Sequence, residues 1–208
     1  AASDVYKRQM VRSLRSLIAD YEEQVRRTER SNGEYFTAMI RGELSPEQVA
    51  EEHAEFFTDP YVLVGLYLEW PTGVKADPEL IGQLLAGFER NPRYTLHCVA
   101  CPEGLTRAIL YYRITENEDR QRISSMLKEL QSYVKTEYNA EVECCIGGKC
   151  VTMEEFDMGV TYLREHAGLR YLYGESAIVD LEERRTEAEV LRKLAGEYSR
   201  LCLLYTSP

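Results

Sequence analysis

Apolar and polar residues follow one another along this chain in patterns that predict helices and strands in turn. Between Met10 and about Ile40, apolar residues recur every three or four positions, which is the spacing of one helix face. Positions seven apart on this face form a weak heptad, while polar residues occupy the other seam. The pattern fits either a dimeric coiled coil or a single helix packed on its own domain, and both alternatives stay open. The residues that would line the dimer are Leu14, Leu17, Tyr21 and Val25.

Turn residues mark the end of this helix and the start of the next elements. Gly42 suits the left-handed position that follows a helix. Ser45-Pro46-Glu47-Gln48 then has the residues of a capping box, with proline at the first helical position. The run from Tyr61 to Leu68 is almost entirely apolar and bounded by turn residues, which is typical of a central strand buried on both faces.

The remaining pattern predicts a domain of alternating helices and strands. The expected elements are a helix after Asp77-Pro78, strands Arg93–Cys101 and Thr106–Thr115, a helix from about Glu118 to Glu137, a strand Glu141–Ile146 ended by a turn at Gly147-Gly148-Lys149, a helix from Thr152, a short strand Ser176–Asp180 and a last helix from Thr186. The short turn at Pro102-Glu103-Gly104 makes the first two of these strands an antiparallel hairpin. From Tyr61 the order is β-α-β-β-α-β-α-β, whose first four strands follow the ferredoxin-like plan. We therefore expect an α+β fold, an antiparallel sheet with helices packed on it and a helical segment before it, with the Tyr61 strand central and the Arg93–Cys101 strand at an edge.

Composition narrows the function classes without supplying any chemistry. The chain has 208 residues and a formal net charge of −10, with a pI near 5.0. An acidic balance argues against direct nucleic-acid binding by this segment, because a phosphate backbone requires a clustered basic face. The longest apolar run is far shorter than the ~20 residues of a membrane-spanning helix. We expect a cytoplasmic location, with a parent protein that is either soluble or membrane-anchored.

Cysteine and histidine positions raise a metal site as an alternative, which the predicted topology disfavours. Cys98 and Cys101 have half of a zinc-ribbon spacing, and Cys144, Cys145 and Cys150 would have to supply the rest. The predicted sheet places the strands that carry these two groups at opposite edges. The three histidines, His53, His97 and His166, fall on separate elements, and none adjoins a plausible nucleophile. We therefore predict no metal and no cofactor.

The two ends of the chain differ from the rest. Residues 1–9 and 202–208 resemble translated sequencing-adapter tails, and we expect that they are not native; frayed native termini are the alternative. The expected division is an N-terminal helical linker and lead-in at 10–57, an α/β domain at 58–183 and a C-terminal connector helix at 184–201. On this interpretation the chain is part of a longer protein.

The order of these elements resembles the GGDEF domain of diguanylate cyclases, and more closely its degenerate relative in AraC-family transcription regulators of the YesN type. The resemblance covers about residues 35–183. It rests on the run Tyr35 to Ser45, similar to the family's helix followed by G-E-[IL]-S, on the strand Tyr61–Glu69, on Cys145-Ile146-Gly147, and on the run Tyr162 to Ala167 leading to Gly174. It implies a nucleotidyl-cyclase-like fold.

One departure from the family bears directly on activity. In active cyclases the hairpin turn carries Gly-Gly-Asp/Glu-Glu-Phe, whose glycines let the backbone approach the nucleotide and whose acid binds Mg²⁺. Here the turn is Cys101-Pro102-Glu103-Gly104-Leu105, and proline removes a backbone donor. Glu69 and Glu103 would be the carboxylates left for a metal, fewer than two-metal phosphoryl transfer requires. We therefore expect that the chain is not an enzyme. The remnant cleft would comprise Glu69, Trp70, Cys101, Glu103 and Gly104.

The sequence supports one leading functional hypothesis and two alternatives. The first is a signal-transmitting, dimerising domain of an AraC-family regulator, placed between an upstream sensor or receiver domain and a downstream helix-turn-helix. The second is a small-molecule or nucleotide sensor that uses the remnant cleft. The third is an active nucleotide cyclase. The first predicts a homodimer that forms through the N-terminal helix.

Overall fold

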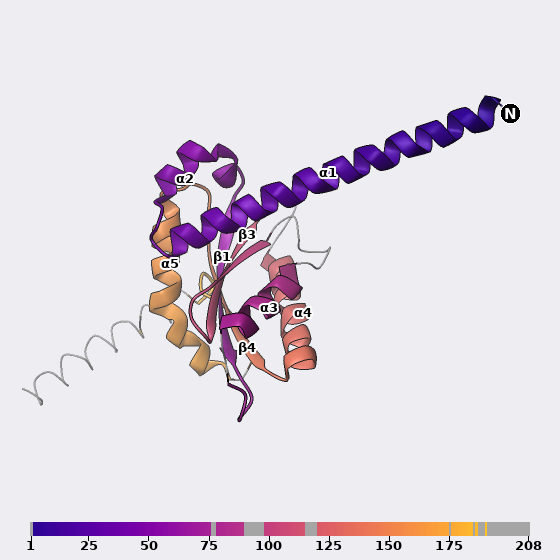
Figure 1. Ribbon diagram of the computed structural model, residues 1–208. Helices are drawn as coiled ribbons and strands as arrows, with labels where there is room; N and C mark the ends of the chain where they lie inside the picture. The colour runs from indigo at the N-terminus through magenta and orange to yellow at the C-terminus, as the bar shows by residue number, and fades with distance from the viewer. Residues whose placement is uncertain are drawn as a thin grey trace, which may run out of the picture.

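In the computed structural model a β-sheet lies between two layers of helices, and one long helix extends away from this body (Figure 1). The structure describes residues 2–75, 78–89, 98–114, 120–174, 176–184, 186 and 190. Its elements are α1 (Ala2–Ile40), α2 (Pro46–Glu52), η1 (Ala54–Phe57), β1 (Tyr61–Glu69), α3 (Pro78–Glu89), β2 (Cys98–Pro102), β3 (Arg107–Arg113), α4 (Arg120–Tyr138), β4 (Glu141–Cys150), α5 (Glu155–His166), η2 (Ala167–Leu172) and β5 (Ile178–Asp180).

The strand order is β2-β3-β1-β4-β5, which confirms the predicted α+β fold class with a ferredoxin-like antiparallel sheet. β1 is central and pairs antiparallel with both β3 and β4, while β2 forms one edge. The other edge differs from the prediction, because β5 pairs parallel with β4 and replaces it as the edge strand. A three-residue strand such as β5 gives too weak a local signal to reveal its pairing partner.

The predicted turn at Gly147-Gly148-Lys149 is wrong, since these residues continue β4 to Cys150. The register of β1 against β4 shifts between Val62 and Val64, so that one residue of β1 faces two of β4 as in a β-bulge. A side chain at position 147 would approach the carbonyl oxygen of Leu63 within 2.9 Å. The glycine pair therefore serves a close approach of two backbones inside the sheet.

Two hydrophobic core clusters fill the space on either side of the sheet. The residues of β1 divide between them by alternation, as expected for a strand covered on both faces. The first cluster lies under α3 and α4 and includes Val64, Leu66, Ile81, Leu84, Leu127 and Leu130. The second lies under the end of α1, α2, η1 and α5 and includes Phe36, Val49, Phe56, Tyr61, Leu63 and Phe156. The predicted lead-in and the predicted α/β domain thus both contribute side chains to the second cluster.

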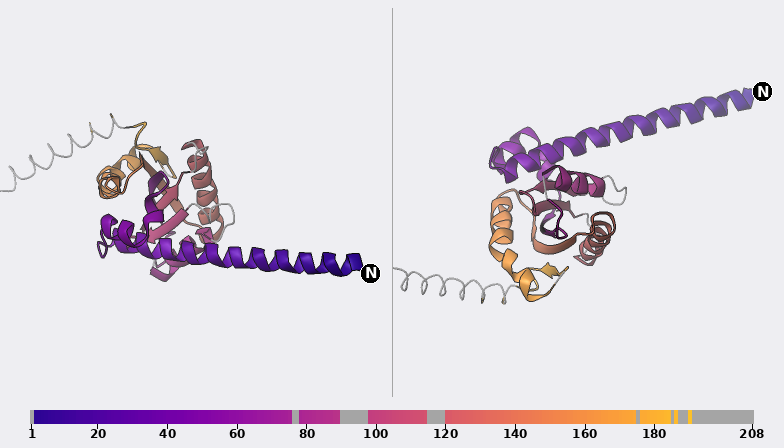
Figure 2. Two further views of the ribbon diagram at one scale, coloured as in Figure 1. Left: turned by 90° about the horizontal axis from the view of Figure 1, so that it is seen from above. Right: turned by 60° about the horizontal axis from the view of Figure 1, so that its bottom comes forward.

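The long helix α1 begins at Ala2, eight residues before the predicted start at Met10, and ends as predicted. Gly42 has a φ of +71°, and the N–H groups of Gly42 and Glu43 donate to the carbonyls of Met39 and Ala38 over 3.0 and 2.9 Å. This is the double hydrogen bond of a Schellman motif. Both further views show the N-terminal half of α1 projecting beyond the body (Figure 2).

The structure confirms one more local prediction, and several other predicted features lie outside the described residues. The capping box at Ser45 is confirmed, with Gln48 accepting from the Ser45 backbone and donating to its hydroxyl. Most of the predicted connector helix at 184–201, the tail at 202–208 and His97 lie outside the described residues. Among the residues that are described, no helix combines the length and the apolar character needed to cross a bilayer.

Candidate functional site

The hairpin turn after β2 holds two of the predicted cleft residues, Glu103 and Gly104. The Glu103 N–H donates to the carbonyl of Arg107 over 2.8 Å, and Gly104 has a φ of +87°, a conformation that glycine adopts without strain. The Glu103 carboxylate forms an ion pair with Arg164 of α5 and is largely buried. Glu103 is thus paired with a cation of its own chain and ties the turn to α5.

The end of β1 lies beside this turn, as the sequence predicts. The indole Nε1 of Trp70 donates to the carbonyl of Leu105 over 2.9 Å, and the N–H of Leu68 donates to the carbonyl of Thr106 over 2.8 Å. Glu69 is exposed and pairs in register with Glu141 of β4. The structure therefore brings Glu69 and Trp70 next to the hairpin turn.

Cys101 occupies a different environment from the one the sequence suggests. It is fully buried in the second core cluster, below the last turns of α1, and does not line a cleft. Burial raises the pKa of its thiol, against the opposing effects of Thr37 on α1 and of Arg41 directly after this helix. Cys101 is therefore a packing contact between β2 and α1. The sequence does not reveal this contact, because the path of α1 over the sheet is a tertiary feature with no local signal.

A cleft of about 550 Å³ opens beside Glu69, and most of its chemistry comes from residues that the sequence analysis misses. We call it the Glu69 cleft; it is lined by Tyr67, Leu68, Glu69, Thr106, Arg107, Glu143, Arg170, Tyr171 and Gly174. Of the predicted remnant-cleft residues, only Glu69 is among them. Arg170, Tyr171 and Gly174 belong to the family-like run that leads to the last strand, which is the one signal that could have identified them.

Arg170 organises one wall of the Glu69 cleft. Its guanidinium lies 4.2 Å from the ring centre of Tyr67 and 3.9 Å from that of Tyr171, so that the cation faces two aromatic rings. Its Nε is 2.7 Å from the carboxylate of Glu143, and both side chains are largely buried. Burial raises the pKa of Tyr67 to about 12, although Arg170 acts in the opposite direction. Tyr67 therefore stays protonated at neutral pH and offers a hydroxyl donor near the cleft.

The predicted dimer residues occupy the projecting half of α1. Leu14, Leu17 and Tyr21 are 54%, 69% and 66% exposed. Val25 lies on the same helix, but its side chain is outside the described part. The exposed apolar side chains on this half, which we call the α1 stripe, are Met10, Val11, Leu14, Leu17, Ile18 and Tyr21. Near the other end of the helix, Tyr35 stacks on His53 of its own domain at a ring distance of 5.4 Å.

The buried cysteines are divided between the two faces of the sheet. Cys98 and Cys144 belong to the first core cluster, whereas Cys101, Cys145 and Cys150 belong to the second. The described residues contain no group of three or more histidine, cysteine or acidic side chains placed to hold a metal ion. Cys98 and Cys101 therefore act as small core residues on opposite sides of β2.

Solved structures of known proteins resemble this chain at low sequence identity. No protein-family model and no curated protein matches the sequence. Among solved structures, a microbial GGDEF domain studied with bis-(3,5)-cyclic di-GMP is 12% identical, with 74% of this chain and 88% of that chain covered and a TM-score of 0.39. The GGDEF domain of DgcB from Caulobacter crescentus, in complex with c-di-GMP, is 11% identical over 66% of this chain and 82% of its own, with a TM-score of 0.39. The diguanylate cyclase SiaD from Pseudomonas aeruginosa, in complex with its activator SiaC, is 14% identical over 86% and 81%, with a TM-score of 0.37.

These comparisons overturn one expectation from the sequence. The substituted turn predicts that the chain is not an enzyme, but the solved structures it resembles are GGDEF domains, and one of them belongs to a diguanylate cyclase. That expectation is withdrawn.

Proposed function

We propose that this chain transmits a signal through α1, which pairs with a second copy by its projecting half and reaches the body by its buried half. One observation carries the proposal: a single helix exposes a stripe of large apolar side chains at one end and buries Phe36 and Met39 at the other. The stripe follows the spacing of coiled-coil seams, with Leu14 and Tyr21 seven residues apart and Leu17 between them. A change in helix pairing would therefore move a helix that is already fixed to the domain core.

The contacts of the buried half indicate where such a movement would arrive. The end of α1 packs on β2, where Thr37 and Arg41 lie close enough to Cys101 to influence its thiol. Two residues further along, Glu103 holds Arg164 of α5. Close-packed interiors transmit displacements because they do not deform continuously. The hairpin turn and α5 are thus the parts of the body that a movement of α1 would displace first.

Sedimentation of the full chain tests this proposal. We expect a concentration-dependent dimer that Leu17→Glu dissociates, because each helix would bring an unpaired carboxylate into the apolar seam. The matched control is Ser16→Glu, which introduces the same residue on the opposite side of the helix. A wild-type chain that stays monomeric at high concentration would contradict the proposal, as would equal effects of the two substitutions.

We propose further that the domain works inside an AraC-type transcription regulator, between an upstream sensor or receiver domain and a downstream helix-turn-helix. Support comes from the order of the family-like motifs between Tyr35 and Gly174. The test is to read the gene beyond both ends of the present sequence. An open reading frame that continues into a helix-turn-helix is expected, and one that does not would refute the assignment.

The Glu69 cleft favours a second candidate function, the binding of a nucleotide or another small anionic molecule. Arg107 is exposed at the cleft, and Arg170 places a second guanidinium in its wall. Calorimetry with GTP and Mg²⁺, together with a product assay, tests this candidate. Arg107→Gln should weaken any binding, whereas Arg113→Gln on the same strand should not, since Arg113 lies outside the cleft and near Asp59. Absence of heat and of product would exclude GTP as the ligand.

A further inference from the structure

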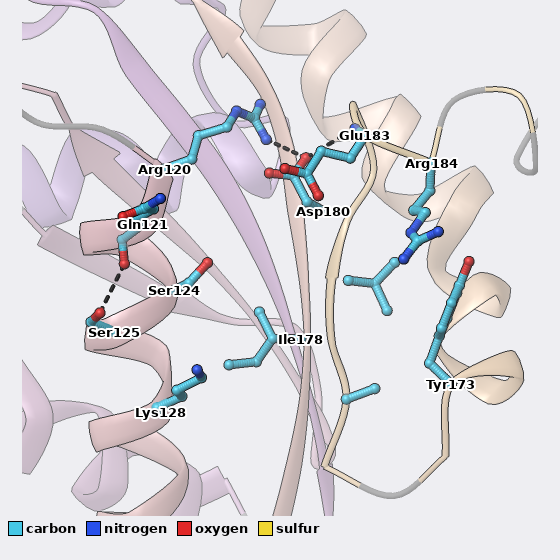
Figure 3. Close-up of a pocket in the computed structure, with 12 residues that line it drawn as sticks. Arg120, Gln121, Ser124, Ser125, Lys128, Tyr173, Ile178, Asp180, Glu183 and Arg184 are labelled. Carbon is cyan, nitrogen blue, oxygen red and sulfur yellow. Dashed lines mark hydrogen bonds and ion pairs between the residues drawn. The ribbon is translucent and has the colours of Figure 1, made fainter.

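A second cleft lies between α4 and the segment that contains β5 (Figure 3). Its volume is about 570 Å³, within the range of ~300–1,000 Å³ typical of small-molecule sites. We call it the α4 cleft. Its walls include Arg120, Ser124 and Lys128 of α4 and, on the facing segment, Tyr173, Ile178 and Arg184.

One end of the α4 cleft is already occupied by a structural ion-pair network. Arg120 donates to the carbonyl of Gly147 over 2.8 Å and forms ion pairs with Asp180 and Glu182. Figure 3 shows Asp180 and Glu183 gathered at this end with Arg120. The guanidinium therefore fastens α4 to β4 and β5, and the acidic groups around it make this end unattractive to an anion.

The other end of the cleft has the opposite character. Lys128 and Ser124 project from α4, and no hydrogen bond or ion pair within the described part of the chain involves the Lys128 ammonium group. Across the cleft, the guanidinium of Arg184 lies 5.2 Å from the ring centre of Tyr173. Ile178 supplies an apolar floor. Both acids that line the cleft, Asp180 and Glu183, belong to the Arg120 end.

We propose that the α4 cleft binds a small organic anion that carries its charge on a planar ring. A carboxylate or phosphate would accept hydrogen bonds from the ammonium of Lys128 and the hydroxyl of Ser124, since ionised acceptors form the stronger hydrogen bonds with such donors. The ring would lie against Tyr173 and Arg184, because aromatic rings and guanidinium planes both stack on flat groups. Ile178 would contact its edge.

Such a ligand would act on the segment between Tyr173 and Arg184. It would join α4 to this segment at a second point, in addition to the Arg120 network at the other end of the cleft. Binding would therefore stiffen the stretch from which the chain continues beyond Arg184. This consequence is independent of the pairing of α1.

Titrations of the isotope-labelled full chain, followed by amide resonances, test the site with four probes. Phenyl phosphate and benzoate combine a ring with an anion and distinguish the two head groups, inorganic phosphate lacks the ring, and benzyl alcohol lacks the charge. We expect saturable shifts of Ser124, Lys128 and Ile178 with at least one of the first two, at a Kd on the order of 1 mM or tighter. Inorganic phosphate and benzyl alcohol should bind at least about tenfold more weakly, a difference that corresponds to about 1.4 kcal/mol.

Two substitutions complete the test. Lys128→Gln should weaken binding of the preferred probe by about tenfold or more, because it removes a charged donor. Lys149→Gln is the matched control, since Lys149 is exposed on β4 outside the cleft. Far-ultraviolet circular dichroism confirms that both variants fold. The proposal is overturned if neither ring-bearing anion shifts these resonances, if benzyl alcohol or inorganic phosphate binds as well as they do, or if the two variants bind alike.

Discussion

The two halves of α1 belong to one continuous helix, yet they meet opposite surroundings. In the half from Met10 to Tyr21, every large apolar side chain is exposed, up to 69% at Leu17. Near the other end, Phe36 is completely buried between Tyr111 and Phe156, with ring distances of 5.8 and 6.1 Å. Among the side chains of α1 that the structure describes, the body thus covers the apolar face over the last turns and leaves the α1 stripe uncovered.

This difference separates two free energies that one helix can influence. Substitutions near Phe36 should change the free energy of unfolding, because apolar burial there is part of the domain core. Substitutions in the α1 stripe should change the free energy of association and leave the body intact.

The largest effect is expected for Phe36→Ala. Truncating a buried phenylalanine typically costs about 3–5 kcal/mol, because apolar contacts are lost and a cavity remains. Tyr21→Ala removes an exposed ring from the same helix and should change the unfolding free energy by no more than about 0.5 kcal/mol. Urea unfolding at low protein concentration measures both. Similar losses for the two variants would break the distinction between the halves.

A second prediction concerns the bulge of β4 within the body. Gly147→Ala would place a methyl group 2.9 Å from the carbonyl oxygen of Leu63, and forcing this backbone apart should cost roughly 1–3 kcal/mol. Gly148→Ala is the control, because no atom lies within 4 Å of its added methyl group. Chemical unfolding of both variants checks the difference. Equal stabilities would mean that the close approach is absent.

The same glycines show where local pattern stops being informative about this fold. The caps at Gly42 and Ser45 and the central strand at Tyr61 were predictable, since each depends on neighbouring residues or on a continuous apolar run. A Gly-Gly pair indicates a turn by local rules, but here Leu63 on another strand decides its conformation. The pairing of β5 with β4 likewise depends on the path of the whole chain.

The candidate site was predictable to a similar extent and for similar reasons. Glu69 ends β1 and Trp70 follows it, and the pattern indicates the position of this strand, so their place beside the hairpin turn could be foreseen. Arg170 reaches the Glu69 cleft only because α5 and η2 fold back along the sheet. Cys101 faces the core because α1 crosses over β2. For Arg170 the one signal in the sequence is the family-like run that leads to the last strand, and no residue near Cys101 signals its position.

Alkaline pH should weaken the body in a defined range. Burial raises the pKa of Cys145 and of Cys150 to about 11, from an ordinary value near 9.0. Below pH 9 both thiols are protonated in both states, so their contribution to stability is complete. Above it the unfolded chain ionises first and stability falls towards pH 11, by about 1 kcal/mol per thiol and pH unit.

Unfolding free energies of the wild-type chain at pH 9 and pH 10 measure this loss. The double substitution Cys145→Ala and Cys150→Ala should reduce the difference between the two pH values, whatever its effect on stability at pH 7. The α1 stripe contains no thiol, so this loss of unfolding free energy belongs to the body of the domain. A pH dependence that the double substitution leaves unchanged would contradict this explanation.

The smallest effect on the body is expected for Leu17→Glu, and this variant separates the two free energies most sharply. If the α1 stripe binds a second copy, the unfolding midpoint of the wild-type chain should rise with protein concentration, because association stabilises the folded state by mass action. Leu17→Glu should remove this dependence, yet at concentrations where the wild type is monomeric it should change the unfolding free energy by no more than about 0.5 kcal/mol. Ser16→Glu should keep the concentration dependence, because its carboxylate points away from the stripe. A Leu17→Glu variant that is destabilised even when dilute would show that the projecting half packs on its own body, and the contrast between the two halves of α1 would then disappear.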